Sequence, residues 1–459
     1  MSSANTLDAA SLRDRLERLA SGHGISRWDL GASCSSDTSV QVDRGEAKQM
    51  KAAQRSAITV RVWNGDDLVG ISSTSDLSDQ GLARALSVAR DASAFGNADD
   101  TPAFSPLATA PLQELDQPLH EPLNILRLLE TLKEAERQLL DRHASIGTVP
   151  YNGLAQRSSE RIYLNSNGAC RQQLQTTASL YLYARAEEAG RKPRSAGAVR
   201  LAYGATELDI TGCIDEAAER TISHLDYAPI QTGHYTCVFS PEAFLDLIGA
   251  FSSLFNARAV LDGVSLSNRE SLGQSLACPF FNLHDNGLHP GNIGASSFDG
   301  EGTPTQRLAL VEGGVLKNFL HSEATARRFG AAPTGHAGMG AKVSVGPDYF
   351  EIGPAGSGGP ELAGQSGLDH LKHQGPLVLI DSLSALHAGV KASQGSFSLP
   401  FDGWLINRGE RVSIEAATVA GDIRTVLKAL IGFEGPAKVT PDGVCPYVWV
   451  DGLSITGEA

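Results

Sequence analysis

Two acidic residues, Asp299 and Glu301, stand between glycines in the segment SFDGEGTPTQR. A carboxylate pair in this setting could take part in catalysis if the rest of the chain supplied a metal, a base or a nucleophile. The glycines beside Glu301 permit left-handed backbone and the close approach of another chain. The same residue types also favour a tight turn, because Asp299 can accept backbone N–H groups and Arg307 can neutralise Glu301 in a forked pair. The segment alone leaves a binding or catalytic site and a structural turn both open.

A zinc site would need ligands at a suitable spacing, often two on one helix face with a third from elsewhere. The chain contains 12 histidines but neither H-E-x-x-H nor H-E-x-x-x-H. The nearest patterns are DHLKH at 369–373, LHDNGLH at 283–289, and His120 followed by Glu121. We interpret the first as an exposed helix end and the second as a turn-rich segment, with a metal site as the alternative.

A catalytic nucleophile is no easier to identify. The sequence lacks the G-x-S-x-G elbow, and its six cysteines form no C-x-x-C pair. This pattern argues against a zinc ribbon, a thioredoxin-like site and a disulfide framework, and is typical of free thiols in a reducing compartment. A hydrolase whose nucleophile is assembled from distant residues stays an open alternative.

The composition excludes several classes of partner. The net charge of −14 and the lack of a dense Lys/Arg run argue against binding to nucleic acid. The first residues have no apolar core of signal-peptide type, and no window reaches the apolar length that crosses a bilayer. We therefore expect a cytoplasmic protein without a membrane partner.

Alternating apolar residues and turn signals predict an α+β fold. A helix over 7–20 precedes strands that turn at Asp43-Arg44-Gly45 and at Asn64-Gly65, and Ser75-Asp76 offers an N-cap to the next helix. Further helices are predicted over 123–143 and 215–225, with a second meander turning at Asn167-Gly168 between them.

The later half reads differently, because glycine-rich turns and short strands dominate it. Ser240-Pro241 predicts the start of one helix near 241-257, the segment 353–367 a loop, and Asp402-Gly403 a turn between strands. We therefore expect two domains: residues 1-228, a helix-covered antiparallel sheet, and residues 229-459, a mostly β domain.

Three long segments then carry a family resemblance. FDGEGTPTQRLALVEGGVLKNFLHSEATARRFGAAPTGHA, GVKASQGSFSLPFDGWLINRGERVSIEAATVAGDI and the closing VDGLSITG resemble the TldD/PmbA family, whose members are also called modulators of DNA gyrase. VRVWNGDDLVGISSTSDLS is similar to the first domain of the same family. The resemblance covers nearly the whole chain.

The resemblance also implies a branch of the family. TldD-type chains carry H-E-x-x-x-H in the helix before the glycine-rich region and a late cysteine as third zinc ligand, whereas TldE/PmbA-type chains lack the motif and pair with TldD as a peptidase. Here that helix reads EAFLDLIGAFSSLFNAR, with no His or Glu from Ala243 to Ala257, and the late Cys445 lies in DGVCPYVWV. The resemblance thus implies a TldE/PmbA-type chain that binds no cofactor itself, with zinc only in a TldD-like partner.

On this reading the protein is the non-catalytic subunit of a zinc metallopeptidase that acts on unfolded peptides. The family encloses an extended peptide in a groove between two subunits, an arrangement suited to main-chain hydrogen bonds. The implied substrate or partner contacts are Asp299, Gly300, Glu301, Gly302, Thr303, Gln306 and Arg307. The alternative is a homodimeric peptide-binding or regulatory protein without peptidase activity.

Overall fold

The computed structural model of the chain describes residues 8–98, 101–340, 342–354, 376–407 and 410–457. They form two compact units. The first comprises Met1–Ile222, Ile293–Thr305 and His321–Val345, and the second Ser223–Asn292, Gln306–Leu320 and Gly346–Ala459. The expected domains 1-228 and 229-459 stay a prediction, since the compact units change at residue 222 and again at the two later segments.

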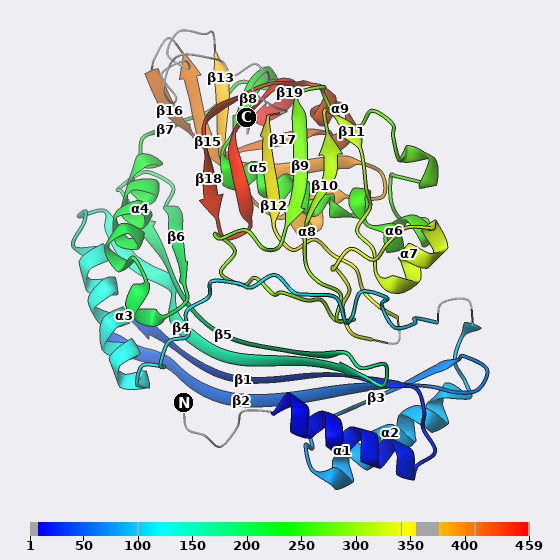
Figure 1. Cartoon of the computed structure of the whole chain (residues 1–459). Helices are drawn as coiled ribbons and strands as arrows, with labels where there is room; N and C mark the ends of the chain where they lie inside the picture. The colour runs from blue at the N-terminus through cyan, green and yellow to red at the C-terminus, as the bar shows by residue number, and fades with distance from the viewer. Residues whose placement is uncertain (1–7, 99–100, 341, 355–375, 408–409, 458–459) are drawn as a thin grey trace. The chain divides into compact units, whose positions relative to one another are not determined.

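A six-stranded antiparallel sheet of order β3-β2-β1-β4-β5-β6 forms the base of the first unit (Figure 1). Its strands are β1 (Trp28–Asp43), β2 (Glu46–Trp63), β3 (Val69–Thr74), β4 (Ile146–Asn165), β5 (Cys170–Ala186) and β6 (Arg194–Ala202). Between β1 and β2, Arg44 and Gly45 have φ values of 52° and 78°, the left-handed conformation that a two-residue hairpin turn needs. The predicted turns there and at Asn167-Gly168 are confirmed.

Helices pack against this sheet. They are α1 (Ala9–Gly22), α2 (Asp79–Ser93), α3 (Ile125–Leu140) and α4 (Ile210–Ser223). Ser78 caps α2 by accepting a hydrogen bond from the Gly81 N–H. The predicted cap at Ser75-Asp76 is therefore wrong, and the Asp76 carboxylate instead accepts from the Ser78 N–H and orders the approach to the helix.

The core under α1 and α2 follows the alternation of the strands. It contains Leu12, Leu16, Trp28, Leu30, Ile58, Val60, Val62, Leu82, Leu86 and Leu164. Because successive side chains on a strand point to opposite faces, Asp29, Arg61 and Tyr163 point to the other face of the sheet. That face positions the candidate site.

The second unit is built on a 13-stranded sheet, whose main order is β11-β10-β9-β12-β19-β8-β13-β15-β16-β7, with β14, β17 and β18 beside it. The strands are β7 (Tyr227–Ala228), β8 (Gly233–Phe239), β9 (Phe281–Asn286), β10 (Arg307–Glu312), β11 (Val315–Leu316), β12 (Phe350–Pro354), β13 (Leu377–Leu383), β14 (Val390–Lys391), β15 (Ser396–Asn407), β16 (Glu410–Ile414), β17 (Ala417–Asp422), β18 (Leu430–Thr440) and β19 (Gly443–Gly457). Its helices are α5 (Pro241–Ala250), α6 (Ala257–Leu261), α8 (Leu386–Gly389) and α9 (Ile423–Lys428). With the helix-bearing first unit, this β-rich unit confirms the α+β fold class.

Helix α5 begins as predicted, with Ser240 as N-cap and Pro241 in the first turn. It ends at Ala250, and a short 3-10 helix follows at Ser252–Phe255, so the predicted helix near 241-257 is interrupted. The predicted turn at Asp402-Gly403 is wrong, because both residues lie inside β15. A Cβ on Gly403 would lie 2.0 Å from the carbonyl oxygen of Leu379, so glycine serves the close approach of β13 there.

The predicted loop at 353–367 and helix end at 369–373 lie largely or wholly outside the described residues. Among the helices that the structure describes, none is long and apolar enough to cross a bilayer.

Gly70 in β3 packs directly under α2, where an added Cβ would lie 1.9 Å from the carbonyl oxygen of Ala89. We expect Gly70→Ala to displace α2 and to lower the free energy of unfolding by about 1–3 kcal/mol. Gly147→Ala in β4 is the matched control, since its Cβ would have no neighbour within 4 Å. Urea denaturation of both variants checks this, and equal stabilities would contradict the packing described.

Candidate binding site on the six-stranded sheet

The segment 293–297 lies on the sheet face opposite α1 and α2, held there through its backbone by glutamines of β5. The Gln173 amide donates to the Ala295 carbonyl at 3.0 Å and its oxygen accepts from the Ser297 N–H at 2.9 Å. Gln175 donates to the Ile293 carbonyl at 3.0 Å. This face of the sheet therefore binds a peptide backbone within its own chain.

Asp299 follows this segment and forms a self-bonded turn. Its Oδ1 accepts from the N–H groups of Glu301 and Thr303 at 2.8 and 3.0 Å, and its Oδ2 accepts from the Ala337 N–H at 2.9 Å. Burial raises the pKa of Asp299, while the three N–H donors lower it in part. Both carboxylate oxygens thus have backbone partners, as the turn interpretation expects.

Glu301 is fully buried and has a different role. Its Oε1 lies 3.3 Å from Nη1 of Arg61, and its Oε2 accepts from the Glu323 N–H at 2.8 Å, at the start of α7 (Glu323–Phe329). The expected pairing of Glu301 with Arg307 is wrong. Arg307 lies in β10 and makes a forked pair with Glu351 at 2.9 and 3.0 Å.

The glycines of the segment serve close packing. Gly302 has a φ of 75°, and a Cβ there would lie 2.4 Å from the Tyr163 ring. A Cβ on Gly300 would lie 2.3 Å from the backbone of Gly338. Thr303 is buried and donates to the Ser105 hydroxyl at 2.8 Å, whereas Gln306 is exposed. The seven expected contact residues are therefore not one exposed cluster, and their role towards substrate or partner stays a prediction.

Arg61 is the cation on which this part of the unit depends. Its Nε and Nη2 bind the Asp29 carboxylate, with distances from 2.5 to 3.2 Å, and both side chains have an exposed fraction of 0%. The Tyr163 hydroxyl donates to Asp29 at 3.1 Å. We call Asp29, Arg61, Tyr163 and Glu301 the buried charge cluster.

Electrostatics within the cluster follow from one guanidinium serving two carboxyl groups. Burial raises the pKa of Glu301 to about 8; Arg61 opposes this rise, and Asp299 adds to it. Burial alone would lower the pKa of Arg61, but the charge and hydrogen bonds of Asp29 hold it above its usual range. Burial, followed by the Asp29 charge, raises the pKa of Tyr163.

Sequence reasoning missed Asp29, Arg61 and Tyr163. In the strands WDL and VRV, a charged residue between apolar ones has the pattern of a half-exposed strand with its charge in water. The signal that could have found the pair is their cross-strand register, since Asp29 lies directly opposite Arg61. The register alone does not reveal the loop that covers them.

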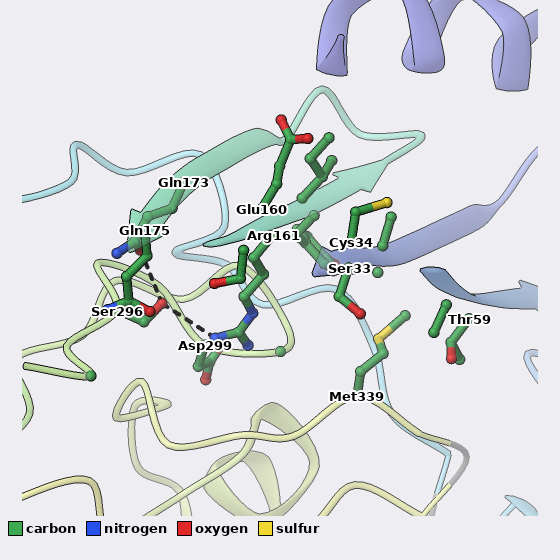
Figure 2. A pocket seen from close by; sticks show the side chains of 18 of the residues that line it. Ser33, Cys34, Thr59, Glu160, Arg161, Gln173, Gln175, Ser296, Asp299 and Met339 are labelled. Carbon is green, nitrogen blue, oxygen red and sulfur yellow. Dashed lines mark hydrogen bonds between the residues drawn. The ribbon is translucent and has the colours of Figure 1, made fainter. Parts of the chain in front are cut away.

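A cavity of about 320 Å³ lies beside the cluster on the same face (Figure 2). Arg161 reaches across it, donating to the Ser296 hydroxyl at 3.2 Å and lying 5.3 Å from the Phe298 ring. The residues that line this cavity include Ser33, Thr59, Arg161, Gln173, Ser296 and Met339. A second hollow of about 480 Å³ continues along the sheet and shares Arg157 and Gly294 with the first. The hydroxyl, amide and guanidinium groups that line the two hollows can bind main-chain amides and carboxylates.

The segment LHDNGLH lies in the second unit. The Nδ1 of His289 accepts from the Gly291 N–H at 2.9 Å, and its ring stacks on Tyr349. The Nε2 of His284 lies 3.8 Å from Glu312, and burial lowers the pKa of this imidazole. The two histidines thus have separate protein partners. The turn-rich interpretation is wrong for His284, which lies inside β9, and holds only from Gly287 onward.

Arg61→Ala should lower the free energy of unfolding by about 3–5 kcal/mol, because it leaves the buried Asp29 carboxylate without its cation and Glu301 without a hydrogen-bond donor. Arg55→Ala on the same strand is the control. Arg55 has an exposed fraction of 61%, so its loss should cost no more than about 1 kcal/mol. Urea denaturation distinguishes the two, and a similar small loss for both would show that the buried charge cluster is dispensable.

A pH series tests Glu301. Its pKa rises from 4.5 in the unfolded chain to about 8 on folding, so the folded state holds an extra proton between these values. The free energy of unfolding should therefore fall as the pH rises through this window. Glu301→Gln, which keeps a neutral acceptor for the Glu323 N–H, should show a flatter dependence by thermal denaturation. Identical slopes for parent and variant would mean that Glu301 is ionised throughout.

Three family models match the chain: PmbA/TldA metallopeptidase domain 1 at residues 28–93, the central domain at 118–225 and the C-terminal domain at 232–457. Metalloprotease PmbA of Escherichia coli O157:H7 is 22% identical over 434 residues, which cover 94% of this chain and 92% of that protein. A Metalloprotease PmbA homolog of Haemophilus influenzae is 23% identical over 450 residues, covering 92% and 90%.

Solved structures share the fold over the same length. A putative modulator of a DNA gyrase from Thermotoga maritima matches with a TM-score of 0.86 and 24% identity, covering 98% of this chain and 100% of that one. TldE from Thermococcus kodakarensis matches with a TM-score of 0.80 and 18% identity, over 98% and 100%. With the three domain models in order along its length, this chain belongs to the PmbA/TldD family of metalloprotease-like proteins.

Proposed function

We propose that this protein is the non-catalytic subunit of a TldD–TldE-type zinc metallopeptidase that acts on unfolded peptides. The observation that carries the proposal is the composition of helix α5 and the residues after it. In the TldD-type branch the corresponding helix supplies H-E-x-x-x-H, whereas this chain has no His or Glu from Ala243 to Ala257.

The side chains of α5 do not fit a zinc ion. Phe244, Leu245, Leu247 and Ile248 are buried in the core of the second unit. From Ala243 to Ala257 the one ionisable side chain is Asp246, whose pKa is raised to about 6 by burial and by the nearby Asp442 and Glu242 carboxylates. A single carboxylate without histidines is a poor zinc site.

Cys445, the late cysteine, does not supply the missing chemistry. It is fully buried in β19, and burial raises the pKa of its thiol well above the usual value. Zinc binds the thiolate, so such a thiol disfavours the metal. In this proposal the zinc belongs to a TldD-like partner, and the six free thiols suit a reducing compartment such as the cytoplasm.

Peptide binding by the subunit is supported by the first unit. Gln173 and Gln175 hold an irregular segment of this chain through its backbone, and open polar hollows continue beside it. Main-chain hydrogen bonds give affinity with little regard for sequence, which suits an unfolded substrate.

The test is cleavage of an unstructured peptide mixture by three samples: this protein, a relative that carries H-E-x-x-x-H, and both together. We expect cleavage only by the mixed sample, lost on adding a chelator and restored by zinc. Substituting the first His of the partner's motif should abolish it, whereas Asp246→Asn in this chain should change the rate less than about twofold.

Other outcomes point elsewhere. Chelator-sensitive cleavage by this protein alone would refute the proposal that it is a non-catalytic subunit. No cleavage by any sample, together with self-association of this chain and no affinity for the relative, would favour the homodimeric regulatory alternative.

A further inference from the structure

The sheet face that carries the candidate site has an open floor made of small side chains. Along β1, β4 and β5, the residues on this face include Ser39, Ala155, Thr177 and Ser179. Small residues cannot fill the space above a sheet, and the hollow of about 480 Å³ lies over this part of it.

The charged side chains that line this hollow are mostly basic. Lys51, Arg55 and Arg157 all line the hollow, together with one acid, Asp37. Asp37 lies 3.6 Å from Arg55 and 3.5 Å from Arg157, so two guanidinium groups share one carboxylate. We call these four residues the basic floor.

The basic floor is accessible and stands out against the rest of the chain. The exposed fractions of the Arg55 and Arg157 side chains are 61% and 51%, and Lys51 is also exposed. Three cations around one carboxylate leave a net charge of about +2 on this patch, in a chain whose net charge is −14. Such a patch attracts carboxylates and repels basic segments.

The nature of the occupant follows from what the same face already holds. Gln173 and Gln175 bind an irregular backbone segment at 293–297, and Ile293 and Gly294 of that segment line the hollow beside the basic floor. A polypeptide laid along the face beyond this segment would lie over the three cations.

We propose that the basic floor selects acidic segments of an extended polypeptide, so that substrates rich in Asp or Glu bind this subunit in preference to neutral or basic ones. The inference rests on the proposed function and adds a substrate class to it. Asp37 acts as an internal competitor for the two arginines, since an incoming carboxylate must replace its ion pairs.

Direct binding tests the proposal separately from cleavage. The probe is a dye-labelled unstructured peptide of Glu, Gly and Ser, with counterparts in which Gln or Lys replaces every Glu, titrated with this protein alone by fluorescence anisotropy. We expect the Glu peptide to bind at least about fivefold more tightly than the Gln peptide, more so at low salt, and the Lys peptide to bind weakest.

Variants locate the effect. Arg55→Gln combined with Arg157→Gln should weaken binding of the Glu peptide about fivefold or more and leave the Gln peptide unchanged. Asp37→Asn should strengthen binding of the Glu peptide. Arg18→Gln on α1 is the matched control, with an exposed fraction of 65% and an ion pair to Asp79, and should change nothing. Circular dichroism melts verify that all variants fold.

Equal affinity for the Glu and Gln peptides would overturn the inference. An equal loss of affinity for the Glu peptide in Arg18→Gln would also overturn it, because the net charge of the protein would then explain the binding without the basic floor. Tighter binding of a single-stranded DNA of the same charge would overturn it in favour of a general anion site. A change in sedimentation of the double arginine variant without a change in peptide affinity would assign the floor to self-association. If the mixed sample still cleaves peptides in any of these cases, the proposed function stands without this inference.

Discussion

A single guanidinium holds together three parts of the first unit that are far apart in the sequence. Arg61 on β2 binds Asp29 on β1 and Glu301 in the segment after residue 293, and Glu301 in turn accepts from the N-terminus of α7. All three side chains are fully buried, so water cannot replace any partner. This contact anchors the segment at Glu301, while Gln173 and Gln175 hold residues 293–297 beside the cavity.

The contact also decides what the carboxylates of SFDGEGTPTQR do. Asp299 bonds three backbone N–H groups and Glu301 bonds Arg61 and α7, so both serve the fold of the unit. Burial raises the pKa of Glu301 to about 8, so we expect the stability of this segment to depend on pH. The polar surface that this arrangement leaves open lies beside the two acids, along the strands of the sheet.

Local signals in the sequence predicted much of the fold. The turns at Arg44-Gly45 and Asn167-Gly168 and the start of α5 at Ser240-Pro241 follow from backbone preferences, which act within a few residues. The turn predicted at Gly403 was wrong because glycine occurs both in turns and where strands pack closely. Only the position of β13 distinguishes the two cases. The partner of Glu301 lies 240 residues away, so no local pattern could identify it. The family resemblance, by contrast, rested on long ordered segments, and the domain matches confirm it.

The absence of histidine and glutamate from Ala243 to Ala257 is the feature on which the functional account depends, and the zinc content tests it most directly. Elemental analysis should be done on this protein purified alone, on a relative that carries H-E-x-x-x-H, and on the complex of the two. The account predicts about one zinc ion per complex, retained by the relative when the chains are separated, and none in stoichiometric amount on this protein. Stoichiometric zinc on this protein alone, lost together with peptide cleavage on chelation, would contradict it.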